Sequence, residues 1–107
     1  MSTSPEQIAR ILDALEPLPV TAKRMFGEYA LYLDGRIPGF VMDGVLALKV
    51  TELVDDRLRP EHRGPIYPRS KDYWRIPPEL LEDREWLLEL VQETTALIEP
   101  PKPKRPR

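Results

Sequence analysis

Two Asp-Gly pairs place the tightest constraint on how this chain folds, because each one separates two short apolar runs. They are Asp34-Gly35 and Asp43-Gly44. An Asp-Gly pair between alternating hydrophobic residues predicts a two-residue hairpin loop, since a type I′ turn needs positive φ at both central positions. The pattern therefore predicts a three-stranded antiparallel meander. Its expected strands span about residues 29–33, 36–42 and 45–50.

The two predicted turns conflict if the middle strand is regular. The first turn requires alternate residues of the middle strand, Phe40 among them, to point their backbone N–H and C=O groups toward the first strand. The second turn requires the same residues to point these groups toward the third strand. In an antiparallel strand the N–H and C=O of one residue point to one side, so that residue cannot serve both neighbours. Either one loop is longer than two residues or the middle strand contains a bulge. The expected site of a bulge is Pro38-Gly39, because proline cannot donate to the ladder and glycine tolerates the strained backbone.

Helical patterns flank the meander on both sides. Ser4 is a good N-cap and Gln7 completes a capping box, so a helix is predicted from Pro5 until Pro17 and Pro19 end it. Its apolar stripe consists of Ile8, Ile11, Leu12 and Leu15.

The second half of the chain predicts shorter elements and a final helix. Thr51 is expected to cap a short helix that ends near Leu58, and residues 66–68 and 73–76 are expected to pair as a second hairpin. Asp83 opens the last helix, which runs to about residue 98. Together these elements predict an α+β fold of two layers, in which helices pack on the antiparallel sheet formed by the meander and the second hairpin.

Length and composition predict one domain and a tail. The chain has 107 residues, of which 1–99 are expected to form the domain and 100–107, PPKPKRPR, a disordered basic tail. All 18 acidic residues precede residue 100, where they meet 12 basic residues, so the body has a net charge of −6. A body this acidic repels phosphate backbones. No signal-peptide pattern and no membrane-length apolar run is present, so we expect a cytoplasmic protein that does not engage a membrane.

The reactive residue types are too few for a convincing catalytic or metal site. The chain has no cysteine and one histidine, His62, which excludes thiolate sites and two-histidine sites. A Ser-His-acid triad would need Ser70 and His62 on one loop, which is poor preorganisation. We therefore expect no enzyme activity, no catalytic residue, no metal and no cofactor.

Two sets of residues are candidates for binding. One sheet face is expected to take the helices, while the second face stays too apolar for open water and predicts a homodimer. The predicted dimer face consists of Tyr29, Leu31, Phe40 and Met42. Aromatic residues beside basic ones suggest base stacking as an alternative. The candidate nucleic-acid contacts are Arg69, Lys71, Arg75, Lys102, Lys104, Arg105 and Arg107.

Several motifs together resemble the N-terminal domain of the TfoX/Sxy competence-regulator family, over about residues 8–98. They are Arg24-Met25-Phe26-Gly27, Tyr32-Leu33-Asp34-Gly35, Leu48-Lys49-Val50 and the stretch from Tyr73 to Asp83. The resemblance implies an antiparallel sheet with helices packed on it, here as a stand-alone domain, and it brings no established catalytic residues. It also marks Arg24, Met25, Phe26 and Gly27 as a structural or interaction motif.

These observations favour a non-enzymatic, cytoplasmic interaction domain with an unknown protein partner, similar to the TfoX N-terminal module and acting as an adaptor in transcriptional regulation. The first alternative is a nucleic-acid-binding accessory protein that uses the basic tail. The second is a small-molecule enzyme of unknown type.

Overall fold

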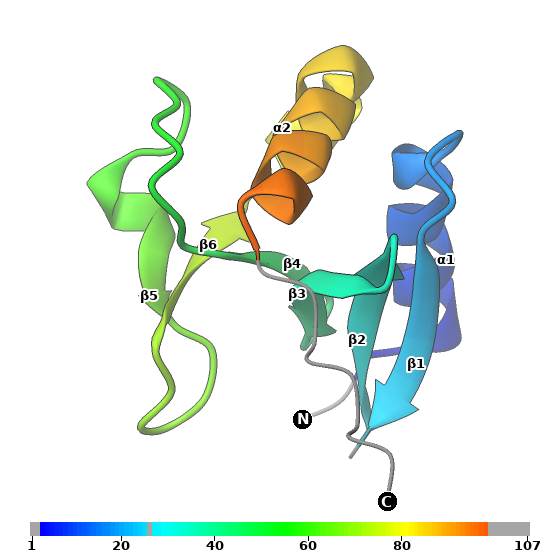
Figure 1. Cartoon of the computed structure of the whole chain (residues 1–107). Helices are drawn as coiled ribbons and strands as arrows, with labels where there is room; N and C mark the ends of the chain where they lie inside the picture. Colours follow the sequence, from blue (N-terminus) through cyan, green and yellow to red (C-terminus); the bar gives the residue numbers. More distant parts are fainter. Residues whose placement is uncertain (1–2, 26, 99–107) are drawn as a thin grey trace, which may run out of the picture.

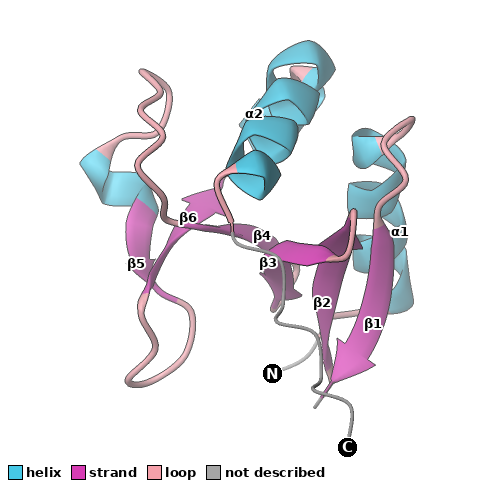
Figure 2. Cartoon of the chain, viewed as in Figure 1, coloured by secondary structure: helices cyan, strands magenta, loops and turns pink. Residues whose placement is uncertain are grey.

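The computed structural model describes residues 3–25 and 27–98, which form a six-stranded antiparallel sheet with two helices on one face. The strand order is β1-β2-β3-β4-β6-β5, and both helices lie on the same side of the sheet (Figures 1 and 2). The predicted two-layer α+β fold is confirmed. In chain order the elements are α1 (Pro5–Leu15), β1 (Thr21–Met25), β2 (Glu28–Leu33), β3 (Arg36–Met42), β4 (Val45–Lys49), the 3₁₀ turn η1 (Pro60–His62), β5 (Arg63–Pro65), β6 (Asp72–Ile76), the 3₁₀ turn η2 (Pro78–Glu82) and α2 (Arg84–Ala96).

Both helices begin at the predicted caps. The Ser4 hydroxyl accepts a hydrogen bond from the Gln7 N–H, and the Gln7 side chain accepts one from the Ser4 N–H, which completes the capping box. The Asp83 carboxylate accepts the Trp86 N–H at the start of α2. The helices bury their apolar stripes in one core against the sheet. Its members include Ile8, Ile11, Leu15, Leu31, Leu33, Val41, Leu46, Leu48, Ile76, Leu87, Leu90 and Val91.

The meander has the two predicted turns and a bulge between them. Asp34 and Gly35 have φ of 52° and 74°, and Asp43 and Gly44 have φ of 51° and 78°, as type I′ turns require. Leu33 pairs with Arg36, but Leu31 pairs with Gly39, so β3 contains one extra residue opposite Tyr32. The bulge therefore involves Ile37 and Pro38, one residue earlier than predicted, and it removes the conflict between the two turns.

This bulge also decides which residues share a face. Because Leu31 pairs with Gly39, and Gly39 pairs with Leu48, all three lie on the side that carries the helices. Leu31 is only 1% exposed in that core. The prediction that Leu31 belongs to the second face is therefore wrong, because the extra residue in β3 shifts the pairing of β2 by one position.

Two further predictions of secondary structure are corrected. Residues 51–58 form no helix, because Thr51 and Asp55 use their side chains to accept the backbone N–H groups of Leu53 and Arg57 in local turns. Asp55 also accepts the Trp86 indole N–H at 2.9 Å, which ties this segment to α2. The second hairpin pairs β6 with residues 63–65 instead of 66–68. The edge strand β1 was not predicted as a full strand.

Candidate functional site

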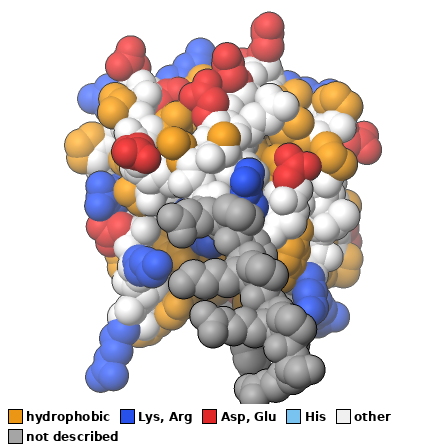
Figure 3. Space-filling model, in the orientation of Figure 1, with side chains coloured by type: hydrophobic (Ala, Val, Ile, Leu, Met, Phe, Trp, Pro, Cys, Tyr) orange, Lys and Arg blue, Asp and Glu red, His pale blue; other side chains and the backbone are white. Residues whose placement is uncertain are grey.

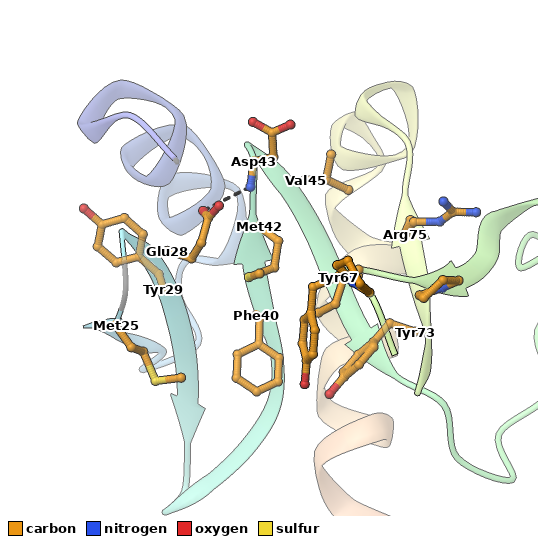
Figure 4. Close-up of a pocket in the computed structure, with 13 residues that line it drawn as sticks. Met25, Glu28, Tyr29, Phe40, Met42, Asp43, Val45, Tyr67, Tyr73 and Arg75 are labelled. Atoms are coloured by element: carbon orange, nitrogen blue, oxygen red, sulfur yellow. Dashed lines mark hydrogen bonds between the residues drawn. The ribbon is translucent and has the colours of Figure 1, made fainter. Parts of the chain in front are cut away.

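A groove runs across the sheet face that the helices leave open, and we call it the open-face groove. It has a volume of about 790 Å³ and receives side chains from all six strands and from the loop after β5 (Figure 4). Its lining residues are Met25, Glu28, Tyr29, Phe40, Met42, Asp43, Val45, Pro65, Ile66, Tyr67, Pro68, Tyr73 and Arg75.

The floor of the groove is aromatic. The rings of Phe40 and Tyr73 meet edge to face, with centroids 5.8 Å apart and an interplanar angle of 79°. Phe40 lies on β3 and Tyr73 on β6, with β4 between them. The residue of β4 that pairs with Phe40 is Ala47, whose small side chain leaves room for the two rings to meet. The two rings can therefore meet across β4 and form the floor of the groove.

The loop between β5 and β6 raises one wall of the groove. Its backbone turns at Tyr67, whose C=O accepts the Ser70 N–H at 3.0 Å, and the Ser70 hydroxyl accepts the Ile66 N–H at 3.0 Å. Tyr67 remains 54% exposed. Its hydroxyl and that of Tyr73 lie on the same side of the groove (Figure 4). Burial, and then the proximity of Tyr67, raise the pKa of Tyr73 above its ordinary value.

A buried carboxylate lies at the β2 end of the groove. Glu28 is 8% exposed, and its Oε1 accepts the Asp43 N–H at 3.0 Å and the Thr3 hydroxyl. The Thr3 oxygen in turn accepts the Gly44 N–H at 3.1 Å. This network joins the start of the described chain to β2 and to the β3–β4 turn. Among residues 3–25 and 27–98, no lysine or arginine forms an ion pair with Glu28.

A guanidinium lies at the opposite end. Arg75 on β6 is exposed, and its Nη2 donates to the carbonyl oxygen of Arg63 at 3.4 Å. Figure 4 shows Glu28 and Arg75 on either side of the aromatic floor. The groove therefore combines an apolar centre, two phenol hydroxyls, an acidic end and a basic end.

Three exposed apolar side chains also line this groove. Met25, Val45 and Tyr67 are 40%, 38% and 54% exposed. The opposite face of the sheet is covered by α1 and α2 (Figure 1). Of the five large apolar side chains that are exposed among the described residues, these three share one groove, while Val54 and Leu97 lie outside its lining; exposed apolar side chains that share a patch are typical of interaction surfaces.

The structure places the predicted dimer face only in part at the groove. Phe40 and Met42 line it from the open face, and Tyr29 borders it, although its pairing with the buried Val41 places Tyr29 on the side of the helices, as with Leu31 in the core. The homodimer stays a prediction. Tyr67, Val45 and Glu28 were not among the predicted site residues. The aromatic character of Tyr67 and an acid at the start of an otherwise apolar strand were the available signals.

The family-like motif is divided. Arg24 and Met25 end β1, and of these Met25 lines the groove. Gly27 has a φ of 83° at the turn into β2, as expected for a bend. Phe26 lies outside the described residues. The role of this motif in interactions stays a prediction.

The candidate nucleic-acid contacts do not surround one hollow. Arg75 lines the open-face groove, while Lys71 borders a separate hollow with Lys49, whose pKa is lowered by burial and then by Lys71. Arg69 lies on the intervening loop with a φ of 70°. The other candidate contacts, Lys102, Lys104, Arg105 and Arg107, lie outside the described residues. Asp and Glu side chains gather over the helices on the side shown in Figure 3.

The two residues considered for a triad have local structural partners. His62 accepts the Arg59 N–H through Nδ1 at 3.2 Å, and the Ser70 hydroxyl donates to the carbonyl oxygen of Lys71 at 2.8 Å. Within the described part of the chain, no three acidic or histidine residues cluster as metal ligands. None of the helices described is both long and apolar enough for a membrane span.

Comparison with known proteins identifies similar chains. A family model described as the TfoX N-terminal domain matches residues 11–97, which include nearly all of both layers. The chain is also similar to a protein of Spirochaeta aurantia described as an uncharacterized 12.7 kDa protein in the trpE 5' region. The two are 35% identical over 106 residues, which make up 98% of this chain and 91% of that protein.

Proposed function

Because this chain belongs to the TfoX N-terminal domain family, we propose that it is a non-enzymatic regulatory domain that binds a protein partner through the open-face groove. The family supports a regulatory domain. The role that we assign within it is that of an adaptor in transcriptional regulation, acting in the cytoplasm.

The observation that carries this proposal is the unequal cover of the two sheet faces. Helices fill one face, whereas the other presents the rings of Phe40, Tyr67 and Tyr73 in a groove open to solvent. An antiparallel sheet can leave one face in water, but that face is then usually polar. An apolar groove with a few polar groups at its ends is typical of a recognition site, in which the apolar part supplies affinity and the polar part supplies orientation.

A matched pair of surface variants tests this proposal. Val45 lies in the groove at 38% exposure, and Val54 lies outside its lining at 91% exposure. We expect the immobilised wild-type chain and Val54→Arg to capture the same protein from native lysate, and Val45→Arg to lose it, because arginine would place a charge in the apolar groove. Equal capture by all three chains would overturn the proposal.

The same preparations test the nucleic-acid alternative. Binding that depends on phosphate contacts weakens steeply as the salt concentration rises, because counterions are released. We expect no gel shift of duplex or single-stranded DNA at near-physiological salt. A shift that disappears with added salt and is unaffected by Val45→Arg would favour the accessory protein instead.

A further inference from the structure

We propose that the open-face groove binds a basic, proline-rich segment, and that its occupant is residues 100–107 of the same chain. This inference rests on the proposed function, since it takes the groove as the partner-binding surface. It deepens that function by naming the chemistry that the groove recognises. The chain would then cover its own binding site, and a partner would have to displace the segment.

The aromatic side chains suit a polyproline II ligand. Such a ligand has three residues per turn and no internal hydrogen bonds, and it docks in grooves lined by aromatic rings. Phe40 and Tyr73 supply an edge-to-face pair, and Tyr67 stands beside them as a wall. The hydroxyls of Tyr67 and Tyr73 lie on one side, where they are available to donate to ligand carbonyls (Figure 4). Residues 100–107 contain four prolines.

The charges of the segment complement the acidic end of the groove, at Glu28, while Arg75 lies at the other end. The segment has four basic residues, Lys102, Lys104, Arg105 and Arg107, and no acidic one. Glu28 is 8% exposed at one end of the groove, and no described residue forms an ion pair with it. Burying a carboxylate without a cation is costly, although the Asp43 N–H and the Thr3 hydroxyl offset part of this cost. A lysine or arginine of the segment would supply the missing positive charge.

The segment starts close enough to reach the groove. The last turn of α2 borders a hollow with the β2–β3 turn, which is lined by Thr95 and Ala96 on one side and by Asp34 on the other. The chain therefore leaves the helix layer beside one end of β3 (Figure 1). Along β3, Phe40 lies four residues from Arg36, or about 13 Å. Nine residues in polyproline II span roughly 28 Å, so the segment can pass around the sheet end, across a layer about 10 Å thick, and reach Phe40 with its last residues.

A spin label on the full chain tests the location of the segment. The sequence has no cysteine, so a cysteine appended after Arg107 introduces the single thiol needed to attach the label and keeps all four basic residues. We expect the label to broaden the amide signals of Phe40, Met42 and Tyr67 and to spare those of α2. Broadening centred on the acidic helix surface, or spread evenly over the domain, would overturn the proposal.

Variants separate the contribution of each interaction. Glu28→Gln keeps the oxygen that accepts the Asp43 N–H and removes only the charge, so it should reduce the broadening, whereas Asp56→Asn at an exposed position should not. Val45→Arg should abolish it. Replacing the four prolines of residues 100–107 by alanine keeps every charge and should also reduce it. If the alanine variant broadens the signals as fully as the original segment, charge alone attracts the segment to the groove. That result would contradict the proposed recognition of a proline-rich segment.

Mixing experiments and mass measurements distinguish other occupants. If spin-labelled chain broadens the groove signals of a second, isotope-labelled chain without a label, the segment binds between molecules and the proposal of self-binding is wrong. A mass of twice 12.4 kDa by light scattering, with the groove protected and the segment free, would show a second copy in its place.

Partner capture separates failure of this inference from failure of the proposed function. If the segment occupies the groove, Lys102→Glu with Lys104→Glu should increase capture of the partner. Unchanged capture in this variant, together with loss of capture in Val45→Arg, would overturn the segment proposal and leave the proposed function intact. Capture that survives Val45→Arg, with the broadening still centred on the groove, would overturn only the proposed function.

Discussion

Replacing Gly39 by alanine should be one of the most damaging small changes in this sheet. Gly39 lies on β3 next to the bulge and pairs with Leu31 on one side and Leu48 on the other. A Cβ at this position would come within 2.1 Å of the Ala47 carbonyl oxygen and 3.0 Å of the Leu48 Cα. Both are backbone atoms of β4, so no side chain can rotate to make room.

The size of the effect follows from that overlap. Carbon atoms in good contact lie about 3.5–4.0 Å apart, so β3 and β4 would have to separate by roughly 1 Å or more. Overpacking typically costs about 1–3 kcal/mol, and weakened ladder hydrogen bonds cost on the order of 1 kcal/mol each. A loss of about 3 kcal/mol would lower the midpoint of thermal unfolding by roughly 12–24 °C in a domain of this size.

Gly35→Ala provides the matched control, because no atom lies within 4 Å of its added Cβ. Its φ of 74° makes alanine unfavourable by about 1–2 kcal/mol through backbone conformation alone. Thermal unfolding followed by circular dichroism, with urea unfolding as a second measure, should therefore rank Gly39→Ala as the less stable variant. The reasoning fails if Gly39→Ala unfolds within about 5 °C of the wild type, or if it proves at least as stable as Gly35→Ala.

Three other outcomes are expected. A hydrogen bond from Arg57 is the main cause of the lowered pKa of Asp83. The Asp83 carboxylate should therefore stabilise the fold above its ordinary pKa of 3.8, and this contribution should be lost as the pH falls through the lowered pKa. Asp83→Asn should thus unfold at a lower temperature than wild type at pH 7 and converge with it in strong acid; a constant difference at every pH would contradict this. The pKa of Tyr73 is raised, so spectrophotometric titration should show one tyrosine that ionises above pH 10.0, and the rise in this pKa should be smaller in Tyr67→Phe. Because the tyrosine of the unfolded chain ionises first, the stability of the fold should decrease as the pH rises beyond that value. Removing residues 100–107 should leave the domain folded, and a midpoint lowered by more than about 5 °C would refute that expectation.

Short-range patterns predicted the elements whose physical cause is local. Ser4 and Gln7 cap α1 through partners three residues apart, and Asp83 caps α2 in the same way. The Asp-Gly turns followed from the backbone preferences of two adjacent residues. Family-like motifs and the apolar stripes then led to a sheet with helices packed on one face. A bulge in β3 was also foreseen, because two adjacent turns cannot both feed a regular strand.

Long-range contacts decided the rest. The bulge at Ile37 and Pro38 adds one residue to β3, and this extra residue moves Leu31 from the open face into the core, since the side-chain period of a strand is two. Residues 51–58 form local turns in place of the predicted helix, and the hydrogen bond from the Trp86 indole to Asp55, 31 residues away, ties these turns to α2.

The groove itself arises from tertiary structure. The Thr3–Glu28 hydrogen bond joins residues 25 positions apart, and Phe40 meets Tyr73 across an intervening strand. The amino-acid sequence by itself determined the caps, the turns and the apolar content, because each depends on neighbours within a few residues. Which apolar and charged side chains face one another across the open sheet depended on strand order and register, and these are set only when the whole chain packs.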